Sequence, residues 1–215
     1  MKMKYFIIIV IFAAVSFSSC NLIIDKDTTA EISKVSIKPV MKLKGDAIMS
    51  LPVGSTYNEE GVDAFVGDSA VNYVIVSGNV NPNQPGFYVV TYKAENQYGW
   101  VSYAYRAVLI YSGSPYGEDI AGHYKKGFLF DSDVSKYNIN GYWQMTNVWS
   151  EEGVDFPIIF ADKGDGTYGI VPGDHPEKGR YGGTGVKNGN KLKFYIHLTS
   201  PDGIQTNQTF DWTKQ

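Results

Sequence analysis

The clearest pattern along the chain is an alternation of apolar and polar residues with a period of two. Between Phe87 and Glu95 one face carries Tyr88, Val90, Tyr92 and Ala94. A second run, rich in β-branched and aromatic residues, extends from Tyr103 to Tyr111. Because turn residues at 96–99 (Asn-Gln-Tyr-Gly) lie between the two runs, the pattern predicts a β-hairpin.

Shorter strand candidates precede this hairpin and are separated by glycine and asparagine. They are Val35–Leu43, Ala47–Leu51, Val62–Phe65 and Tyr73–Val76. Helical periodicity is nearly absent after residue 33, because apolar residues do not recur at helical spacing over three turns. Six or seven strands in about 80 residues predict a β-sandwich over residues 33–112.

The C-terminal part of the chain repeats the alternation after a Gly/Ser/Pro-containing linker at 113–117. The strands expected within 118–215 are Gly122–Phe128, Gly141–Trp149, Phe156–Ala161, Tyr168–Val171, Gly182–Lys187, Lys191–Thr199 and Gln205–Trp212. Glycine- and asparagine-rich turns separate them, which predicts a second domain that closes as a small antiparallel sandwich or a half-open barrel.

The N-terminus has the pattern of a secretory signal. Lys2 and Lys4 precede an apolar run, Tyr5–Val15, that is shorter than the roughly 20 residues of a membrane-spanning helix. Small residues then lead to Cys20, the only cysteine. This ending resembles a bacterial lipobox, which implies removal of residues 1–19 and acylation of Cys20, with palmitate among the acyl chains. The alternative is an ordinary secretory signal with an incidental cysteine.

Acylation of Cys20 would make a membrane the first partner of the mature chain, as an anchor rather than a span. Residues 20–32 are polar and read as a flexible tether. Their acidic residues resemble surface-export signals of Gram-negative lipoproteins. The expected location is therefore the outer membrane, while periplasmic and outward orientations both stay open.

Two further resemblances bear on the folded part. Residues in 51–57, 61–64, 85–94 and 106–108 resemble a bacterial immunoglobulin-like (Ig-like) family common in surface lipoproteins. The stretch Asp119–Tyr124 resembles the start of second domains in lipoproteins encoded with Sus-type glycan-uptake systems. The likeness implies an all-β chain, with an N-terminal Ig-like β-sandwich followed by a second small antiparallel β-sandwich or barrel. It also implies an outer-membrane uptake complex as a partner.

Composition narrows the function. The chain has 215 residues, with 19 basic and 22 acidic residues and a net charge of −3. Removing residues 1–19 takes away two lysines and no acid, which leaves 17 basic and 22 acidic residues, or −5. This balance argues against a nucleic-acid partner. A single cysteine and three dispersed histidines give no metal-ligand pattern, so no metal or cofactor is expected.

The sequence carries no nucleophile elbow, zinc-protease motif or phosphate-binding loop, so no catalytic residue is expected. Acidic residues do gather in two loops. A glycoside hydrolase remains a third hypothesis if two of them face each other about 5–10 Å apart across a cleft. The candidates are Glu152, Asp155, Asp174 and Glu177.

Aromatic residues in the second domain suggest a sugar site, because Trp and Tyr rings stack on sugar faces while polar groups bind the hydroxyl rim. Alternation places Trp143, Asn147 and Trp149 on one face of their strand, and Tyr195 and His197 outward on Lys191–Thr199. The alternative is that both tryptophans fill the core, as expected for Trp212. Tyr98 and Trp100, on the first-domain hairpin turn, are exposed-contact candidates or a strut against the second domain.

The leading hypothesis is a non-enzymatic lipoprotein whose C-terminal β domain binds carbohydrate through Trp143, Trp149, Asn147, Tyr195 and His197. The alternative is a structural or protein-interaction lipoprotein of a surface complex. The shape of the aromatic patch separates the two hypotheses. A sugar site needs a cleft or platform, whereas a standard protein interface needs about 800 Å² per partner.

Overall fold

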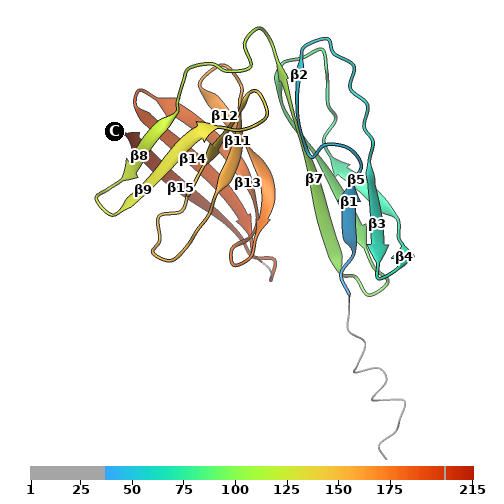
Figure 1. The fold of residues 1–215 in the computed structure, drawn as a ribbon. Helices are drawn as coiled ribbons and strands as arrows, with labels where there is room; N and C mark the ends of the chain where they lie inside the picture. Colours follow the sequence, from blue (N-terminus) through green and yellow to red (C-terminus); the bar gives the residue numbers. More distant parts are fainter. Residues whose placement is uncertain (1–36, 201) are drawn as a thin grey trace, which may run out of the picture. The chain divides into compact units, whose positions relative to one another are not determined.

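The computed structural model describes residues 37–200 and 202–215. Residues Ile37–Gln215 form one compact unit, and every regular element described in it is a β-strand (Figure 1). The predicted signal peptide, Cys20 and the tether lie outside the described residues. The all-β prediction is confirmed.

The first domain consists of two small sheets. One has the order β1-β3-β4, and the other has the order β2-β7-β6-β5. The bounds are β1 (Val40–Leu43), β2 (Ile48–Pro52), β3 (Val62–Val66), β4 (Ser69–Ala70), β5 (Tyr73–Ser77), β6 (Gly86–Glu95) and β7 (Val101–Tyr111). The predicted hairpin is the β6–β7 pair, which runs without interruption from Gly86↔Ile110 to Glu95↔Val101. Apolar residues of both sheets form the core, including Val62, Val90, Val108 and Ile110.

One charge lies inside this domain. Arg106 on β7 is fully buried and donates to the carboxylate of Glu59 and to the carbonyl oxygen of Lys44. The hydroxyls of Tyr57 and Tyr92 and the backbone amide of Gly61 also donate to Glu59. A buried cation needs such partners, because an unpaired charge in a protein interior is strongly destabilising.

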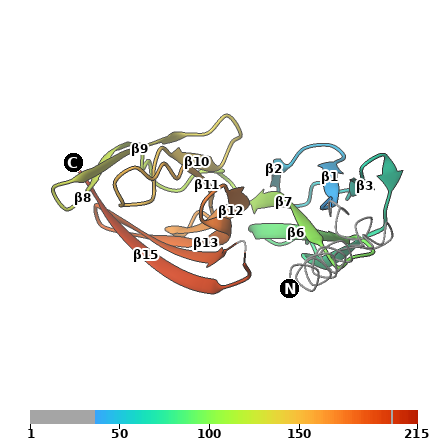
Figure 2. The same cartoon turned by 90° about the horizontal axis from the view of Figure 1, so that it is seen from below.

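The second domain is a closed barrel of eight strands in the order β10-β11-β12-β13-β14-β15-β8-β9. The bounds are β8 (Gly122–Lys126), β9 (Phe130–Lys136), β10 (Tyr142–Met145), β11 (Ile158–Asp162), β12 (Thr167–His175), β13 (Gly179–Asn188), β14 (Lys191–Thr199) and β15 (Gln205–Lys214). In Figure 2 the labelled strands of this set form a ring. The β9–β10 pairing closes the barrel and leaves no free edge. The predicted linker, 113–117, lies between β7 and β8.

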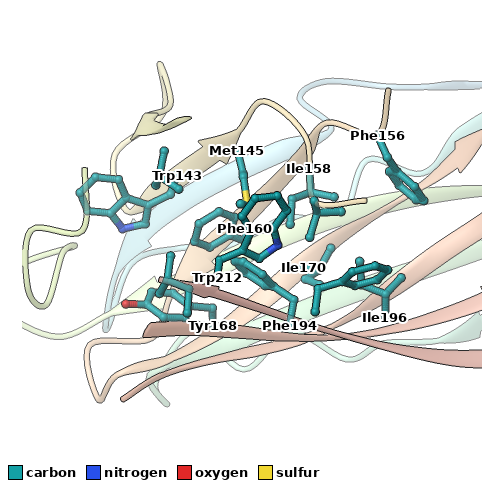
Figure 3. Packing of buried hydrophobic residues seen from close by; sticks show 14 of the residues in the cluster. Trp143, Met145, Phe156, Ile158, Phe160, Tyr168, Ile170, Phe194, Ile196 and Trp212 are labelled. Carbon is teal, nitrogen blue, oxygen red and sulfur yellow. The ribbon is translucent and has the colours of Figure 1, made fainter. Parts of the chain in front are cut away.

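Large aromatic residues fill the barrel (Figure 3). Phe160 packs edge to face against both Tyr168 and Phe194, with ring centroids 5.4 and 5.1 Å apart. Leu192, Phe194, Ile196 and Leu198 of β14 all point inward, as the alternation predicts. Since burying one such side chain contributes about 1.5–3 kcal/mol, this cluster is the main stabilising element of the domain.

A third apolar cluster joins the two domains within the compact unit. Its buried members are Leu109 of β7, Tyr142 of β10 and Ala161 of β11. The Tyr142 hydroxyl donates to the carbonyl oxygen of Met49, 3.0 Å away, and burial raises the pKa of this tyrosine. Gly169 makes room for the contact, because a β-carbon there would lie 2.0 Å from Cδ1 of Phe87. The two domains are therefore packed against each other rather than merely linked.

Candidate functional site

The two tryptophans expected to contact a ligand lie in the core. Trp143 is completely buried within the barrel cluster (Figure 3), and its indole Nε1 donates to Oδ2 of Asp162, 3.2 Å away. Side chains alternate between the inside and the outside of a closed barrel, and Trp143 and Met145 of β10 point inward. This placement corrects the prediction of Trp143 as a ligand contact and agrees with the alternative that it fills the core.

Trp149 and Asn147 are structural residues of a loop, because β10 ends at Met145 rather than at Trp149. Trp149 is only 9% exposed and stacks on Phe156 at 5.4 Å between ring centroids. The Asn147 side-chain oxygen accepts from the amides of Trp149 and Phe156, and its Nδ2 donates to the carbonyl oxygen of Val154. The polar groups of Asn147 are thus used to close the loop, which corrects the prediction that these two residues face a ligand.

Tyr195 and His197 do point outward from β14, as predicted. Tyr195 is 41% exposed and lies between Thr184 of β13 and Thr209 of β15. His197 is also exposed, and its Nδ1 forms a hydrogen bond with Oδ1 of Asn207. Because the tryptophans lie inside the barrel and this pair lies outside it, the five predicted residues do not form one site.

A hollow of about 700 Å³ lies where the first domain meets one end of the barrel. One wall consists of Lys38 and Val101–Tyr103, at the start of β7. The other consists of Asp174–Pro176 and Gly179–Arg180 of the β12–β13 hairpin, together with Thr199, Ser200 and Gly203. We call this hollow the cleft. Thr199 lies two residues beyond His197 on β14, so the outward row of that strand leads into the cleft.

Two cations rest on aromatic rings in this region. The guanidinium of Arg180 lies 3.9 Å from the centroid of the Tyr103 ring, and the Lys38 ammonium lies 5.5 Å from the Trp100 ring. Trp100 is 46% exposed beside Val101. Contacts of this kind hold a cation in place while its remaining N–H groups stay free to donate. The cleft therefore combines aromatic surface with hydrogen-bond donors.

Asp174 adds a carboxyl group to the cleft. It lies directly opposite Arg180 in the β12–β13 ladder. Burial raises the pKa of Asp174 above its ordinary value, although the positive charges of Arg180 and Lys38 act in the opposite direction. The hydroxyls of Thr199 and Ser200 line the same hollow.

His175 fixes the hairpin that carries these groups. Its Nδ1 accepts from the backbone amides of Glu177 and Lys178, and its Nε2 lies 2.8 Å from the carbonyl oxygen of Asp155. These partners assign the proton to Nε2. The ring also stacks on Phe156, with centroids 4.5 Å apart. His175 therefore acts as a positioning residue, and both its ring nitrogens are occupied.

A smaller hollow of about 390 Å³ shares Asp174–Pro176 of the same hairpin with the cleft. Three of the four carboxylates considered for a hydrolase line it, namely Asp155, Asp174 and Glu177. Within residues 37–200 and 202–215, no group of three His, Cys, Asp or Glu side chains is arranged to hold a metal ion. In the same residues no helix is long and apolar enough to cross a membrane.

Trp100 was expected from the sequence to be an exposed contact, whereas Arg180, Tyr103 and Lys38 were not expected at a site. The cleft brings together strands from both domains, so no local pattern could reveal it. The only sequence signal was the aromatic turn at 98–100.

Residues 41–110 match the family model described as Bacterial surface protein, Ig-like domain. This match lies inside residues 33–112, where the sequence resembles a bacterial Ig-like family, and the first domain is thus of a kind found in bacterial surface proteins. Among curated proteins, none matches this sequence.

Two solved structures are similar to the chain, with low sequence identities and low TM-scores. A lipoprotein from Bacteroides thetaiotaomicron shares 17% identity, with 82% of this chain and 100% of that chain covered and a TM-score of 0.36. The CBM51-2 and INT domains of ZmpB from Clostridium perfringens, solved in complex with GlcNAc, share 13% identity over 81% of this chain and 41% of that chain, with a TM-score of 0.29. The chain thus spans less than half of the second protein.

Proposed function

We propose that the protein is a non-enzymatic lipoprotein, anchored in the outer membrane through Cys20, that binds carbohydrate in the cleft at the Arg180 end of the barrel. The Ig-like domain forms one wall of this cleft. In this proposal the glycan passes to an outer-membrane uptake complex of the Sus type, which is the expected partner.

The observation that carries the proposal is the composition of the cleft. Its volume, about 700 Å³, falls in the range of about 300–1,000 Å³ typical of small-ligand sites. The ring of Trp100 at its margin is exposed for stacking on a sugar face. Hydroxyl, carboxyl and guanidinium groups line the walls, as recognition of sugar hydroxyls requires. Tyr195 and His197 extend the surface along β14 for a longer glycan.

Affinity electrophoresis tests this proposal. The full-length chain in neutral detergent is run through gels containing plant, host or microbial polysaccharides. We expect one polymer to retard the protein and Trp100→Ala to weaken that binding by about tenfold, since one stacked ring contributes about 1.4 kcal/mol or more. Phe128→Ala is the matched control, because Phe128 is fully exposed on the β8–β9 turn. Retardation lost only in Tyr195→Ala would move the site to the outer face of β14, and no retardation would refute carbohydrate binding.

The anchor is tested separately by labelling cells with radioactive palmitate. We expect label on the wild-type chain and none on Cys20→Ser, with both chains secreted. An unlabelled wild-type chain would support the alternative of an ordinary secretory signal.

A second candidate function, protein interaction, is supported by exposed apolar residues away from the cleft. Every residue of the edge strand β5 is exposed, with Val74, Ile75 and Val76 between 48% and 56%. An uncharged edge strand can accept a strand from a partner. If this function holds, Ile75→Lys abolishes cross-linking to a defined partner on intact cells, while polysaccharides retard neither protein.

A hydrolase, the third hypothesis, is supported by the shared hollow of Asp155, Asp174 and Glu177. It predicts new reducing ends when the protein is incubated with the polymer that binds it, and their loss in Asp174→Asn. Binding without release of reducing ends supports the non-enzymatic proposal.

A further inference from the structure

The two cations of the cleft outnumber its acids, because Asp174 is the one acid among the described residues that line it. Neither Lys38 nor Arg180 forms an ion pair with a carboxylate in residues 37–200 and 202–215. In the same residues, several other surface cations do have such a partner, as in the Lys187–Glu118 pair at 2.7 Å. Each of the two positive charges therefore lies over an aromatic ring, and neither forms a salt bridge with Asp174.

Arg180 is held in a fixed position at this site. It lies near the start of β13 and is paired with Asp174 on one side and Thr199 on the other. Its guanidinium stacks on Tyr103 at 3.9 Å. A planar guanidinium fixed in this way can donate two parallel N–H groups to the oxygens of a carboxylate or sulfate.

One carboxyl group, Asp174, shares the cleft, so the local count is two cations to one acid. With two cations and one acid among its described lining residues, the cleft keeps a net positive charge even when Asp174 is ionised. The whole chain has a net charge of −3, so the rest of its surface repels anions on average. An anionic polymer would therefore be attracted to this cleft and repelled by the average surface.

We infer that the cleft selects a glycan bearing an anionic group, such as the carboxylate of a uronic acid, and that Arg180 and Lys38 bind this group. The inference rests on the proposed carbohydrate-binding function and names its ligand class. Trp100 and the hydroxyls of Thr199 and Ser200 would contact the sugar ring, while the two cations bind its charge.

The test compares each acidic polysaccharide with its own carboxyl-reduced form, in which an alcohol replaces the carboxylate. The probes are polygalacturonate, alginate and hyaluronan. Chondroitin sulfate and its desulfated form are also compared, to distinguish binding of sulfate from binding of carboxylate. The full-length chain in neutral detergent is used throughout. We expect one acidic polymer to bind at least about tenfold more tightly than its reduced form, as charge-assisted hydrogen bonds predict. Added salt should weaken this binding.

The variants are Arg180→Gln and Lys38→Gln, with Lys191→Gln as the matched control because Lys191 is exposed at the turn between β13 and β14. We expect the first two to remove the preference for the acidic polymer and the control to retain it. Circular dichroism verifies that each variant is folded. Equal binding of the acidic and reduced forms, or a preference that persists in both cleft variants, would overturn the inference but leave carbohydrate binding in place. If no polymer binds, the proposed function itself fails.

Discussion

At the scale of single residues, Glu59 shows how the first domain tolerates the buried charge of Arg106. Burial alone would raise the pKa of Glu59, but hydrogen bonds from Tyr57, Tyr92 and the Gly61 amide, together with the Arg106 charge, hold it below its usual value. Burial and the bond to Glu59 raise the pKa of Tyr57 to about 12. The tyrosines therefore stay protonated and donate to the carboxylate at neutral pH.

This arrangement predicts a pH-dependent stability. A carboxyl whose folded pKa is depressed stabilises the protein above its unfolded pKa, near 4.5, and loses that contribution as the pH falls through the folded value. We expect the urea midpoint to fall with acidification below that pH. Glu59→Gln should be less stable at neutral pH by roughly 3 kcal/mol, because Arg106 loses its counter-charge, and should depend less on acid.

Glu177→Gln is the control for this prediction, since Glu177 is an exposed carboxylate on the β12–β13 hairpin. Its acid dependence should match that of the wild type. An unchanged acid dependence in Glu59→Gln would contradict the assigned role of Glu59.

Gly169 gives a second prediction at the residue scale. A methyl group there would collide with the ring of Phe87 across the domain contact. We expect Gly169→Ala to lower stability by about 1–3 kcal/mol, as overpacking does, measured by urea unfolding. Gly182→Ala is the control, because its β-carbon would meet Pro172 only at an ordinary 3.6 Å. Equal stability of the two variants would show that the Phe87 ring can move aside without loss of stability, which would contradict the prediction.

At the scale of elements, the β12–β13 hairpin depends on His175, which accepts two amide hydrogen bonds within the hairpin and approaches the backbone of Asp155. His175→Ala removes these bonds. We therefore expect faster hydrogen exchange over residues 174–180, as well as weaker glycan binding because Arg180 loses its support. His123→Ala, at an exposed hydrogen bond with Asp133, should leave this exchange unchanged. Unaltered exchange in His175→Ala would contradict the positioning role.

Strands whose apolar and polar residues alternate strictly could be predicted from the sequence, whereas strands without this alternation could not. β14 has the predicted bounds, Lys191–Thr199, because its apolar residues alternate strictly. β9 was missed, since Asp131, Ser132 and Asp133 interrupt the apolar pattern. β10 was predicted too long, because the side chain of Asn147 bonds the backbone and ends the strand. That misplacement carried Trp149 into the predicted site.

At the scale of the whole molecule, the two domains share an apolar cluster that includes Leu109 and Tyr142. We therefore expect one cooperative thermal transition for residues 37–215. Tyr142→Ala removes a buried ring and its bond to Met49, and should split the transition into two in scanning calorimetry. Tyr137→Ala, which removes a half-buried ring from the rim of the cluster, should shift the transition without splitting it. Two transitions in the wild-type chain would contradict this coupling.

The cleft belongs to this scale as well, which is why sequence patterns did not reveal it. Alternation located the strands that carry Tyr103 and Thr199, but only the packing of the domains brings Lys38 and Arg180 to the same hollow. The predicted outward direction of Tyr195 was correct because it depends on one strand alone.

Carbohydrate binding in the cleft is tested most directly by the affinity of the full-length chain for polysaccharides, compared with the affinities of Trp100→Ala and the Phe128→Ala control. We expect retardation by at least one polymer, with binding weakened about tenfold in Trp100→Ala and unchanged in the control. Retardation by no polymer, or equal retardation of all three proteins, would contradict a carbohydrate site in the cleft.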